Sequence, residues 1–413
     1  MTFLYLLGIR IFQLLVNVAS LFNPKAKLWI KGRKNIFSQL SKSIHIEDKI
    51  AWFHCASLGE FEQGRPVIES FKERFPGYKI LLTFYSPSGY EIRKNYEHAD
   101  FVYYLPIDTP GNAKRFLNII NPKYVFFIKY EFWYFFLREI ERRKIPLFLV
   151  SGIFRKNQRF FKPNGIKSRK MLRWFTHFFV QNEESKQLLH AIHIDNVTVT
   201  GDTRFDRVYA ITQQSKDLAL IELFAKNNIV LVAGSTWKPD EEILIRFFNE
   251  SATPFKLIIA PHEIHKENIL RISKSISNEK RVLKYSEADN ENIAKADVLI
   301  IDSIGILSSV YKYGTIAYIG GGFGKGIHNI LEAATFGLPI LFGPNYEKFK
   351  EAIDLKNLGG AFSITDFIQL EKNLNSLLKD ENRIKNCGKI SSAYVEKNRG
   401  ATKAILETVK IDE

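Results

Sequence analysis

Residues 315–344 read TIAYIGGGFGKGIHNILEAATFGLPILFGP. An apolar run ends in three glycines at positions 320–322, and a loop, a predicted helix from about Ile330 and a second apolar run follow. The order predicts a strand, a glycine loop, a helix and a strand. Glycines let backbone N–H groups approach a ligand closely, and a helix N-terminus carries partial positive charge. The loop is therefore a candidate site for an anion such as a phosphate.

The spacing of this loop excludes two better-known phosphate loops. No G-x-G-x-x-G fits residues 320–326, and Ile327 stands where a Walker loop has lysine. What remains suits a nucleotide diphosphate or monophosphate sugar, with Glu332 able to accept hydrogen bonds from ribose hydroxyls. Alternatively, Asn329 caps the helix and Glu332 completes a capping box.

The length and composition indicate a folded protein of two domains. The chain has 413 residues, which is too long for one ordinary core, and 46% of them are hydrophobic. The net charge of +15 makes a polyanion or an anionic membrane surface a plausible partner. No nucleic-acid partner is expected, because the basic residues are spread among acidic ones and no RNA- or DNA-binding motif is present.

The cysteines and histidines predict no metal site and no disulfide. Cys55 and Cys387 are far apart, which suits a reducing compartment. The sequence from His262 to His265 is one residue short of H-E-x-x-H. We expect no metal and no cofactor.

The chain begins with an apolar segment followed by basic residues. Residues 3–22 are about long enough to span a bilayer as a helix. Arg10, Gln13 and Asn17 share one narrow face, so a helix lying in the membrane interface is an equal alternative, and a buried first helix is a third. The basic flank (Lys25, Lys27, Lys31, Arg33 and Lys34) should lie against anionic lipid on the cytoplasmic side.

Short apolar runs alternate with helical segments from residue 49 onwards, which predicts parallel sheets covered by helices. We expect two Rossmann-like, doubly wound α/β domains with a cleft between them, and ligands at the carboxyl ends of the strands. The predicted parts are a membrane-associated helix with its basic flank (1–35), a first domain (36–206), a linker (207–228) and a second domain (229–413). The predicted strands are 50–56, 79–85, 101–105, 123–129, 146–151, 177–181 and 197–201, then 229–235, 255–261, 297–302, 315–320 and 339–343.

Two carboxylates follow predicted strands of the first domain. Glu60 lies three residues after Ser57, so the pair forms a possible capping box. Alternatively, Glu60 is a carboxylate at the mouth of the cleft that takes a proton from an acceptor hydroxyl. Glu131 lies between two aromatic residues at the end of another strand.

Six segments in the same order resemble the 3-deoxy-D-manno-octulosonic acid (Kdo) transferases of bacterial lipopolysaccharide synthesis. The segments, each followed by the family pattern it resembles, are HCASLGE at 54–60 (H-A-A-S-V-G-E), TFYSPSG at 83–89 (T-T-M-T-P-T-G), YLPIDTPG at 104–111 (Y-L-P-Y-D-L-P-G), EFW at 131–133 (E-L-W), TGDTRFD at 200–206 (T-G-N-L-K-F-D) and HNILEA at 328–333 (H-N-P-L-E-P). The sequence departs from the family at 261–264, where PHEI replaces P-R-H-P and leaves His262, Lys266 and Lys325 as alternative basic contacts to the donor.

The resemblance implies an inverting, metal-independent glycosyltransferase of the GT-B fold. Its donor is CMP-Kdo, and its acceptor is a lipid A precursor (lipid IVA) at the cytoplasmic face of the bacterial inner membrane. It implies that Glu60 is the general base, that Glu131 is a second acidic residue needed for activity, and that Glu332 contacts the donor ribose. The expected donor-binding residues are Ser235, Thr236, Pro261, His262, Gly321, Gly322, Lys325, His328, Asn329 and Glu332, and those on the acceptor side are Ser57, Gly59, Ser86, Ser88 and Arg204.

Two other functions stay open from the sequence. A sugar-nucleotide 2-epimerase has a similar two-domain fold and a similar glycine-to-glutamate segment, but no use for a membrane helix. A non-catalytic, membrane-bound sugar-nucleotide-binding protein would need the second domain and not Glu60.

Overall fold

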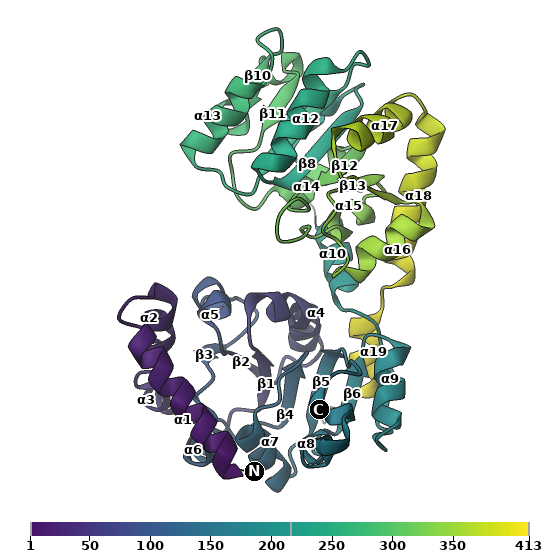
Figure 1. Ribbon diagram of the computed structural model, residues 1–413. Helices are drawn as coiled ribbons and strands as arrows, with labels where there is room; N and C mark the ends of the chain where they lie inside the picture. The colour runs from purple at the N-terminus through teal and green to yellow at the C-terminus, as the bar shows by residue number, and fades with distance from the viewer. Residues whose placement is uncertain (1, 215–216, 412–413) are drawn as a thin grey trace. The chain divides into compact units, whose positions relative to one another are not determined.

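The computed structural model describes residues 2–214 and 217–411, which form two compact units. The first unit contains residues 1–207 together with 399–413, and the second contains residues 208–398. Each unit has one seven-stranded sheet in which every pair of neighbouring strands is parallel (Figure 1). The α/β class expected from the alternating apolar runs is therefore confirmed.

The first sheet has the strand order β3-β2-β1-β4-β5-β6-β7. Its strands follow the apolar runs of the sequence closely. They are β1 (Ile50–Cys55), β2 (Lys79–Phe84), β3 (Phe101–Tyr104), β4 (Tyr124–Ile128), β5 (Leu147–Gly152), β6 (His177–Val180) and β7 (Val197–Val199). The helices are α1 (Thr2–Ala19), α2 (Pro24–Lys31), α3 (Ile36–Ser43), α4 (Leu58–Arg74), α5 (Pro87–Arg93), α6 (Pro110–Ile120), α7 (Tyr134–Arg142), α8 (Ile166–Leu172), α9 (Glu183–His190) and α19 (Ala401–Thr408).

This sheet is covered on both faces because successive side chains of a strand point to opposite sides. Trp52 packs into an apolar layer with α3, α6 and α7, whereas the next residue, Phe53, packs with α4 on the other face. Both rings are fully buried. The continuous apolar strands of the sequence are the consequence of this double cover.

The C-terminal helix α19 belongs to the first unit, although the sequence analysis placed it in the second domain. Ile405 and Leu406 pack into the layer that contains Phe53. Asp206 accepts hydrogen bonds at 2.7 Å from the backbone N–H groups of Gly400 and Thr402, which fixes the start of the helix. An amphipathic pattern predicts a helix but does not say which core the helix joins.

The second sheet has the order β10-β11-β9-β8-β12-β13-β14. Its two edge strands, β10 and β14, have three residues each and are the strands that the sequence analysis missed. The strands are β8 (Val230–Thr236), β9 (Lys256–Pro261), β10 (Val282–Lys284), β11 (Val298–Ile300), β12 (Ile316–Ile319), β13 (Ile340–Phe342) and β14 (Ala361–Ser363). The helices are α11 (Ala219–Ala225), α12 (Lys238–Glu250), α13 (Lys266–Ser275), α14 (Leu307–Val310), α15 (Leu331–Thr335), α16 (Lys350–Leu358), α17 (Phe367–Leu378) and α18 (Glu381–Lys397).

The predicted linker, residues 207–228, contains helical structure where it is described. Helix α10 (Arg204–Gln213) runs across the division between the units, and α11 follows it. Positions 215 and 216 lie outside the described residues.

The N-terminal helix α1 is held against the first unit by one face. The Tyr5 hydroxyl donates to the buried carboxylate of Asp108 at 2.7 Å, and Phe12 packs edge-on against Trp29 of α2. The other faces of α1 expose large apolar side chains, including Phe3, Leu4, Leu14 and Leu15. Among residues 2–214 and 217–411, no helix has both the length and the hydropathy needed to cross a bilayer.

Candidate active site

The residues singled out in the first unit follow three adjacent strands. β2, β1 and β4 are neighbours in the sheet, and all three run in the same direction. Their carboxyl ends therefore meet at one edge, which brings the loops carrying Ser86, Glu60 and Glu131 together.

Glu60 lies in the first turn of α4, with its carboxylate turned back towards the end of β1. Its Oε2 accepts a hydrogen bond from the Ala56 backbone N–H at 2.6 Å. Ser57 is the N-cap of α4, but its side chain makes no capping hydrogen bond. The reciprocal capping box that the spacing allowed is therefore not formed.

The environment of Glu60 raises the pKa of its carboxyl group to about 7. Burial is the largest cause, because it disfavours the charged form, and the nearby negative charge of Glu131 acts in the same direction. The Ala56 N–H and the charge of Lys129 lower the pKa, but less strongly. A carboxylate that titrates near neutral pH is suited to general base catalysis.

Glu131 is buried and belongs to a polar network. Its Oε2 lies 3.2 Å from Nε2 of His54 and accepts a hydrogen bond from the Trp133 indole N–H. On the other side of the imidazole, His54 Nδ1 lies 2.9 Å from the Thr83 hydroxyl. The contact of His54 with Glu131, and that of Thr83 with His54, were not predicted from the sequence, although these residues belong to quoted segments, because only the order of the strands places them side by side.

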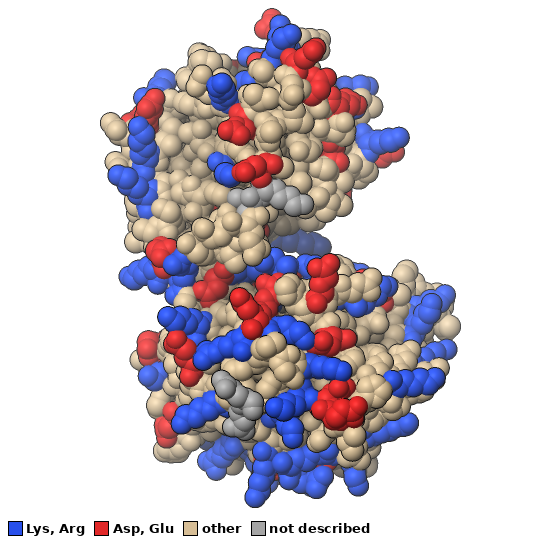
Figure 2. Space-filling view, turned by 180° about the vertical axis from the view of Figure 1, so that it is seen from behind, with Lys and Arg blue, Asp and Glu red and all other residues tan. Residues whose placement is uncertain are grey.

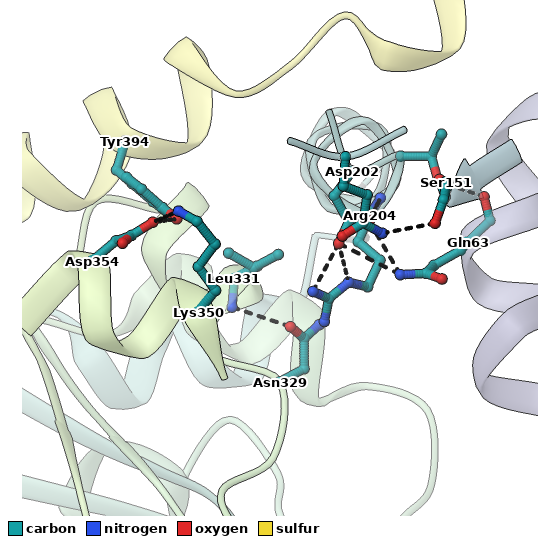
Figure 3. Close-up of polar contacts among 11 residues, drawn as sticks. Gln63, Ser151, Asp202, Arg204, Asn329, Leu331, Lys350, Asp354 and Tyr394 are labelled. Atoms are coloured by element: carbon teal, nitrogen blue, oxygen red, sulfur yellow. Dashed lines mark hydrogen bonds and ion pairs between the residues drawn. The ribbon is translucent and has the colours of Figure 1, made fainter. Parts of the chain in front are cut away.

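The residues assigned to the acceptor side lie in two separate parts of the first unit. Ser86 is the N-cap of α5, and its hydroxyl lies 2.9 Å from that of Ser88, while Gly59 is exposed beside Glu60. Arg204 comes after β7, the strand farthest from β3 in the sheet. Its guanidinium pairs with Asp202, which accepts a long hydrogen bond from Gln63 of α4 (Figure 3).

In the second unit, the glycine loop is pressed against the end of β8. A Cβ atom at Gly320 would lie 2.3 Å from the carbonyl oxygen of Ser235, so no larger residue fits there. Gly321 has a φ of +91°, which glycine adopts without strain. The loop therefore needs glycine at these two positions for different reasons, close approach and backbone conformation.

A buried carboxylate behind the loop fixes its shape. Asp240 of α12 accepts hydrogen bonds from the Gly321 N–H at 2.9 Å, the Trp237 N–H at 2.9 Å and the Tyr318 hydroxyl at 2.7 Å. Its exposed fraction is 0%. The next residue, Glu241, is also buried and accepts from the Thr236 hydroxyl at 3.0 Å. Thr236 therefore donates its hydroxyl hydrogen within the unit, and Pro261 beside it is buried.

Three rings stack at the carboxyl ends of the adjacent strands β9, β8 and β12. The His262 ring stacks on Trp237, with centroids 4.6 Å apart, and on His328, with centroids 4.7 Å apart. The Trp237 indole N–H donates to Nε2 of His328 at 3.1 Å. Trp237 is absent from the sequence-predicted site, because an isolated tryptophan after a strand carries no motif.

Asn329 and Glu332 interact with each other at the start of α15. The Asn329 amide donates to Glu332 Oε1 at 3.0 Å. The Asn329 Oδ1 accepts from the Leu331 N–H at 3.2 Å (Figure 3). Lys325, in the glycine loop, is exposed. Within the described part of the chain, no group of three or more His, Cys, Asp or Glu side chains is arranged to hold a metal ion.

Comparison with known proteins finds similarity to one family in particular. The sequence model of the 3-deoxy-D-manno-octulosonic-acid transferase (kdotransferase) family matches residues 30–207. A 3-deoxy-D-manno-octulosonic acid transferase from Aquifex aeolicus is 29% identical over 357 residues, covering 84% of this chain and 92% of the relative. One from Rickettsia prowazekii is 27% identical over 383 residues, covering 90% of this chain and 82% of the relative. Over most of its length, this chain is therefore similar to Kdo transferases.

Solved structures share the GT-B-like fold with two parallel sheets. The UDP-GlcNAc 2-epimerase from Neisseria meningitidis has a TM-score of 0.60, covers 87% of this chain and 99% of its own, and is 17% identical. MurG from Acinetobacter baumannii has a TM-score of 0.54, covers 87% of this chain and 98% of its own, and is 12% identical. At such identities the likeness concerns the fold alone. Glu60 and Glu131 both lie inside residues 30–207, the range that the Kdo transferase sequence model matches.

Proposed function

We propose that this protein is a Kdo transferase that moves Kdo from CMP-Kdo to a hydroxyl of a lipid A precursor, lipid IVA, with Glu60 as the general base. The observation that carries the proposal is the position of Glu60. It lies after β1 within the matched family range, partly buried, with a pKa of about 7. Mass spectrometry of lipid IVA after incubation with CMP-Kdo made in situ tests the proposal, since the product mass gives both the reaction and the number of transfers. An unmodified lipid would refute it.

The proposed reaction is a single displacement. The Glu60 carboxylate accepts the proton of the acceptor hydroxyl while the hydroxyl oxygen attacks the anomeric carbon of Kdo. The bond from that carbon to the phosphate oxygen breaks, and CMP leaves with the electron pair. Attack on the face opposite the leaving group inverts the anomeric centre. Glu131, held by His54 and Trp133, keeps a negative charge near Glu60 that favours the proton-accepting role.

The donor fits the second unit because its leaving group is an anion. The N–H groups of Gly320, Gly321, Gly324 and Gly326 donate to groups within the unit, whereas Lys325 and His262 supply the hydrogen-bond donors and positive charge. Such donors stabilise charge that develops on the departing phosphate. Glu332, one turn beyond the loop, is the proposed partner of the ribose hydroxyls.

Replacing Glu332 with alanine should weaken donor binding more than it slows the chemical step. Ribose contacts are similar in the ground state and the transition state, so the KM for CMP-Kdo should rise while kcat is maintained. Steady-state kinetics at varied CMP-Kdo concentration measures both. Asn329→Ala is the matched control, because it removes the partner of Glu332 but keeps the carboxylate. An unchanged KM in a folded Glu332→Ala variant would leave Glu332 with a capping role only.

The same proposal places the protein on an anionic membrane surface through α1. The apolar side chains of α1 are exposed on a helix that one narrow face holds to the first unit. Basic side chains lie near both ends of α1. Beyond its C-terminal end come Lys25, Lys27 and Lys31. Near its N-terminal end, Tyr5 contacts Tyr134, and Tyr134 contacts Trp174, at the end of a second basic segment.

That second segment has eight basic residues and no acidic one between Arg155 and Arg173. Arg155, Lys156, Lys170 and Arg173 are exposed. Lys and Arg are also prominent on the face of the first unit seen in Figure 2. An apolar stripe between basic groups is suited to the head-group region of a membrane that contains anionic lipid, where the acceptor is found. We place the protein at the cytoplasmic face of the inner membrane on this basis.

The double substitution Leu14→Glu and Leu15→Glu should release the protein from anionic vesicles. Burying one leucine is worth about 1.5–3 kcal/mol, so two losses should weaken partitioning on the order of 100-fold. Co-sedimentation with vesicles measures it. The control is Leu358→Glu with Ile368→Glu, two exposed apolar residues of the second unit. Equal release by both pairs, or by neither, would contradict the assignment of α1.

A further inference from the structure

The stack of Trp237, His262 and His328 contains two imidazoles that differ in their ability to take up a proton. An indole N–H only donates, so Nε2 of His328, which accepts it at 3.1 Å, carries no hydrogen. That hydrogen bond selects the neutral form of His328 with its proton on Nδ1. Protonating Nε2 would place two N–H groups against each other.

His328 is also the less exposed of the two imidazoles. Its ring lies against the glycine loop, since a Cβ at Gly321 would meet His328 Cδ2 at 3.0 Å. Burial lowers the pKa of His328, and the neighbouring His262 lowers it further. His262 is exposed and lies with its ring over the face of Trp237. A cation is attracted to the face of an indole.

Acidic side chains near the stack already have partners within the protein. Asp240, behind Gly321, attracts positive charge to His328, but its oxygens accept three hydrogen bonds. The Glu263 carboxylate lies 3.4 Å from Nε2 of His265, beside the stack. The charged or titratable groups on the surrounding elements include Lys238, Asp240, Glu241 and Glu242 on α12, Glu263, His265, Lys266 and Glu267 after β9, Lys325 in the glycine loop and Glu332 on α15.

We propose that His262 takes up a proton when the donor phosphate binds, and that Trp237 and His328 hold its ring in position for this. The inference rests on the proposed donor site. A phosphodiester bound at the glycine loop favours the charged imidazolium, so donor affinity depends on pH although the donor itself does not titrate near neutrality. His262 then positions anionic donors and gives specificity for them. It carries a positive charge only when its imidazole is protonated.

Calorimetric titration of the full chain with the methyl ester of cytidine 5′-monophosphate tests the proposal. This ester is a phosphodiester, so its phosphate has no titration between about pH 5 and pH 9. An imidazole pKa raised by one unit above its ordinary value on binding would raise Kd about sixfold between about pH 6 and pH 8. Near neutral pH, the measured heat should change with the ionisation enthalpy of the buffer, which reports proton uptake directly.

Three variants separate His262 from other titrating groups. His262→Arg keeps a planar cation able to stack, so its Kd should be independent of pH. His262→Gln should bind at low pH only as weakly as the wild type does at high pH. His265→Asn, three residues away and outside the stack, should keep the wild-type pH profile.

The outcomes distinguish this inference from the proposed function. A wild-type Kd that is equal at both pH values, or a His262→Arg variant that keeps the pH dependence, would overturn the role of His262 and leave the donor site intact. An ester that binds at neither pH would refute the donor site itself.

Discussion

Glu60→Gln should lose most of its turnover while its fold and donor binding remain. A sugar hydroxyl is a poor nucleophile at neutral pH, and removing a positioned base costs about 10²- to 10⁴-fold in rate. Glutamine keeps the shape of the side chain, and its amide oxygen can still accept from the Ala56 N–H. We therefore expect kcat to fall by at least 100-fold, roughly the lower end of that range, with CMP affinity unchanged.

The pH dependence gives this variant a second signature. Because burial and Glu131 raise the pKa of Glu60 to about 7, wild-type kcat should fall as the pH drops below neutral and the base becomes protonated. The residual rate of Glu60→Gln should lack that decline. A kinetic pKa near that of Glu60, present in the wild type and absent in the variant, indicates a catalytic role, because a purely structural role of Glu60 would not produce it.

The stability of the protein should respond in the opposite direction. A carboxyl pKa that is raised on folding means that the folded state binds more protons than the unfolded state between the two pKa values. The stabilising contribution is present below the unfolded pKa and is lost as the pH rises through about 7. At alkaline pH, Glu60→Gln should therefore melt at or above the wild-type temperature.

Near-wild-type turnover by a folded Glu60→Gln variant would exclude Glu60 as the base, and Glu131 would be the next residue to test.

Asp240→Ala should disrupt the proposed CMP-Kdo site indirectly, because Asp240 lies behind the glycine loop. The substitution removes the acceptor for the Gly321 N–H, the Trp237 N–H and the Tyr318 hydroxyl at once. A buried donor left without a partner costs about 1–3 kcal/mol, so the loss should reach about 3 kcal/mol even if water satisfies some of the groups. Because the loop then loses its fixed shape, we expect CMP affinity to fall at least tenfold, or about 1.4 kcal/mol.

Hydrogen exchange at residues 320–322 and calorimetry with CMP measure the two effects separately. Tyr318→Phe is the matched control, because it removes one of the three hydrogen bonds and leaves Gly321 and Trp237 attached to Asp240. Its exchange rates should rise slightly, and its CMP affinity should stay within about twofold, because the hydrogen bonds from Gly321 and Trp237 to Asp240 that shape the loop remain. Wild-type affinity in Asp240→Ala would show that the carboxylate does not shape the loop.

Twelve of the fourteen strands that the structure describes, and their alternation with helices, could be predicted from the sequence, because a strand buried on both faces is a continuous apolar run. β10 and β14 could not, since three half-buried residues at a sheet edge leave no such run. The absence of a reciprocal capping box at Ser57 was also beyond the sequence. The Glu60 carboxylate accepts from the backbone at Ala56 and Ser57, but the Ser57 side chain makes no capping hydrogen bond, and only the tertiary structure shows this.

The sequence by itself determined the α/β class, the glycine loop and the segments that resemble Kdo transferases, because each is encoded in residues close together along the chain. The tertiary structure alone decided which side chains meet. The coupling of Glu60 to Glu131, the support of Gly321 by Asp240 and the stack of Trp237 with two histidines each join residues from different strands. The order of strands in a parallel sheet differs from their order in the sequence, so contacts at its edge depend on the whole fold.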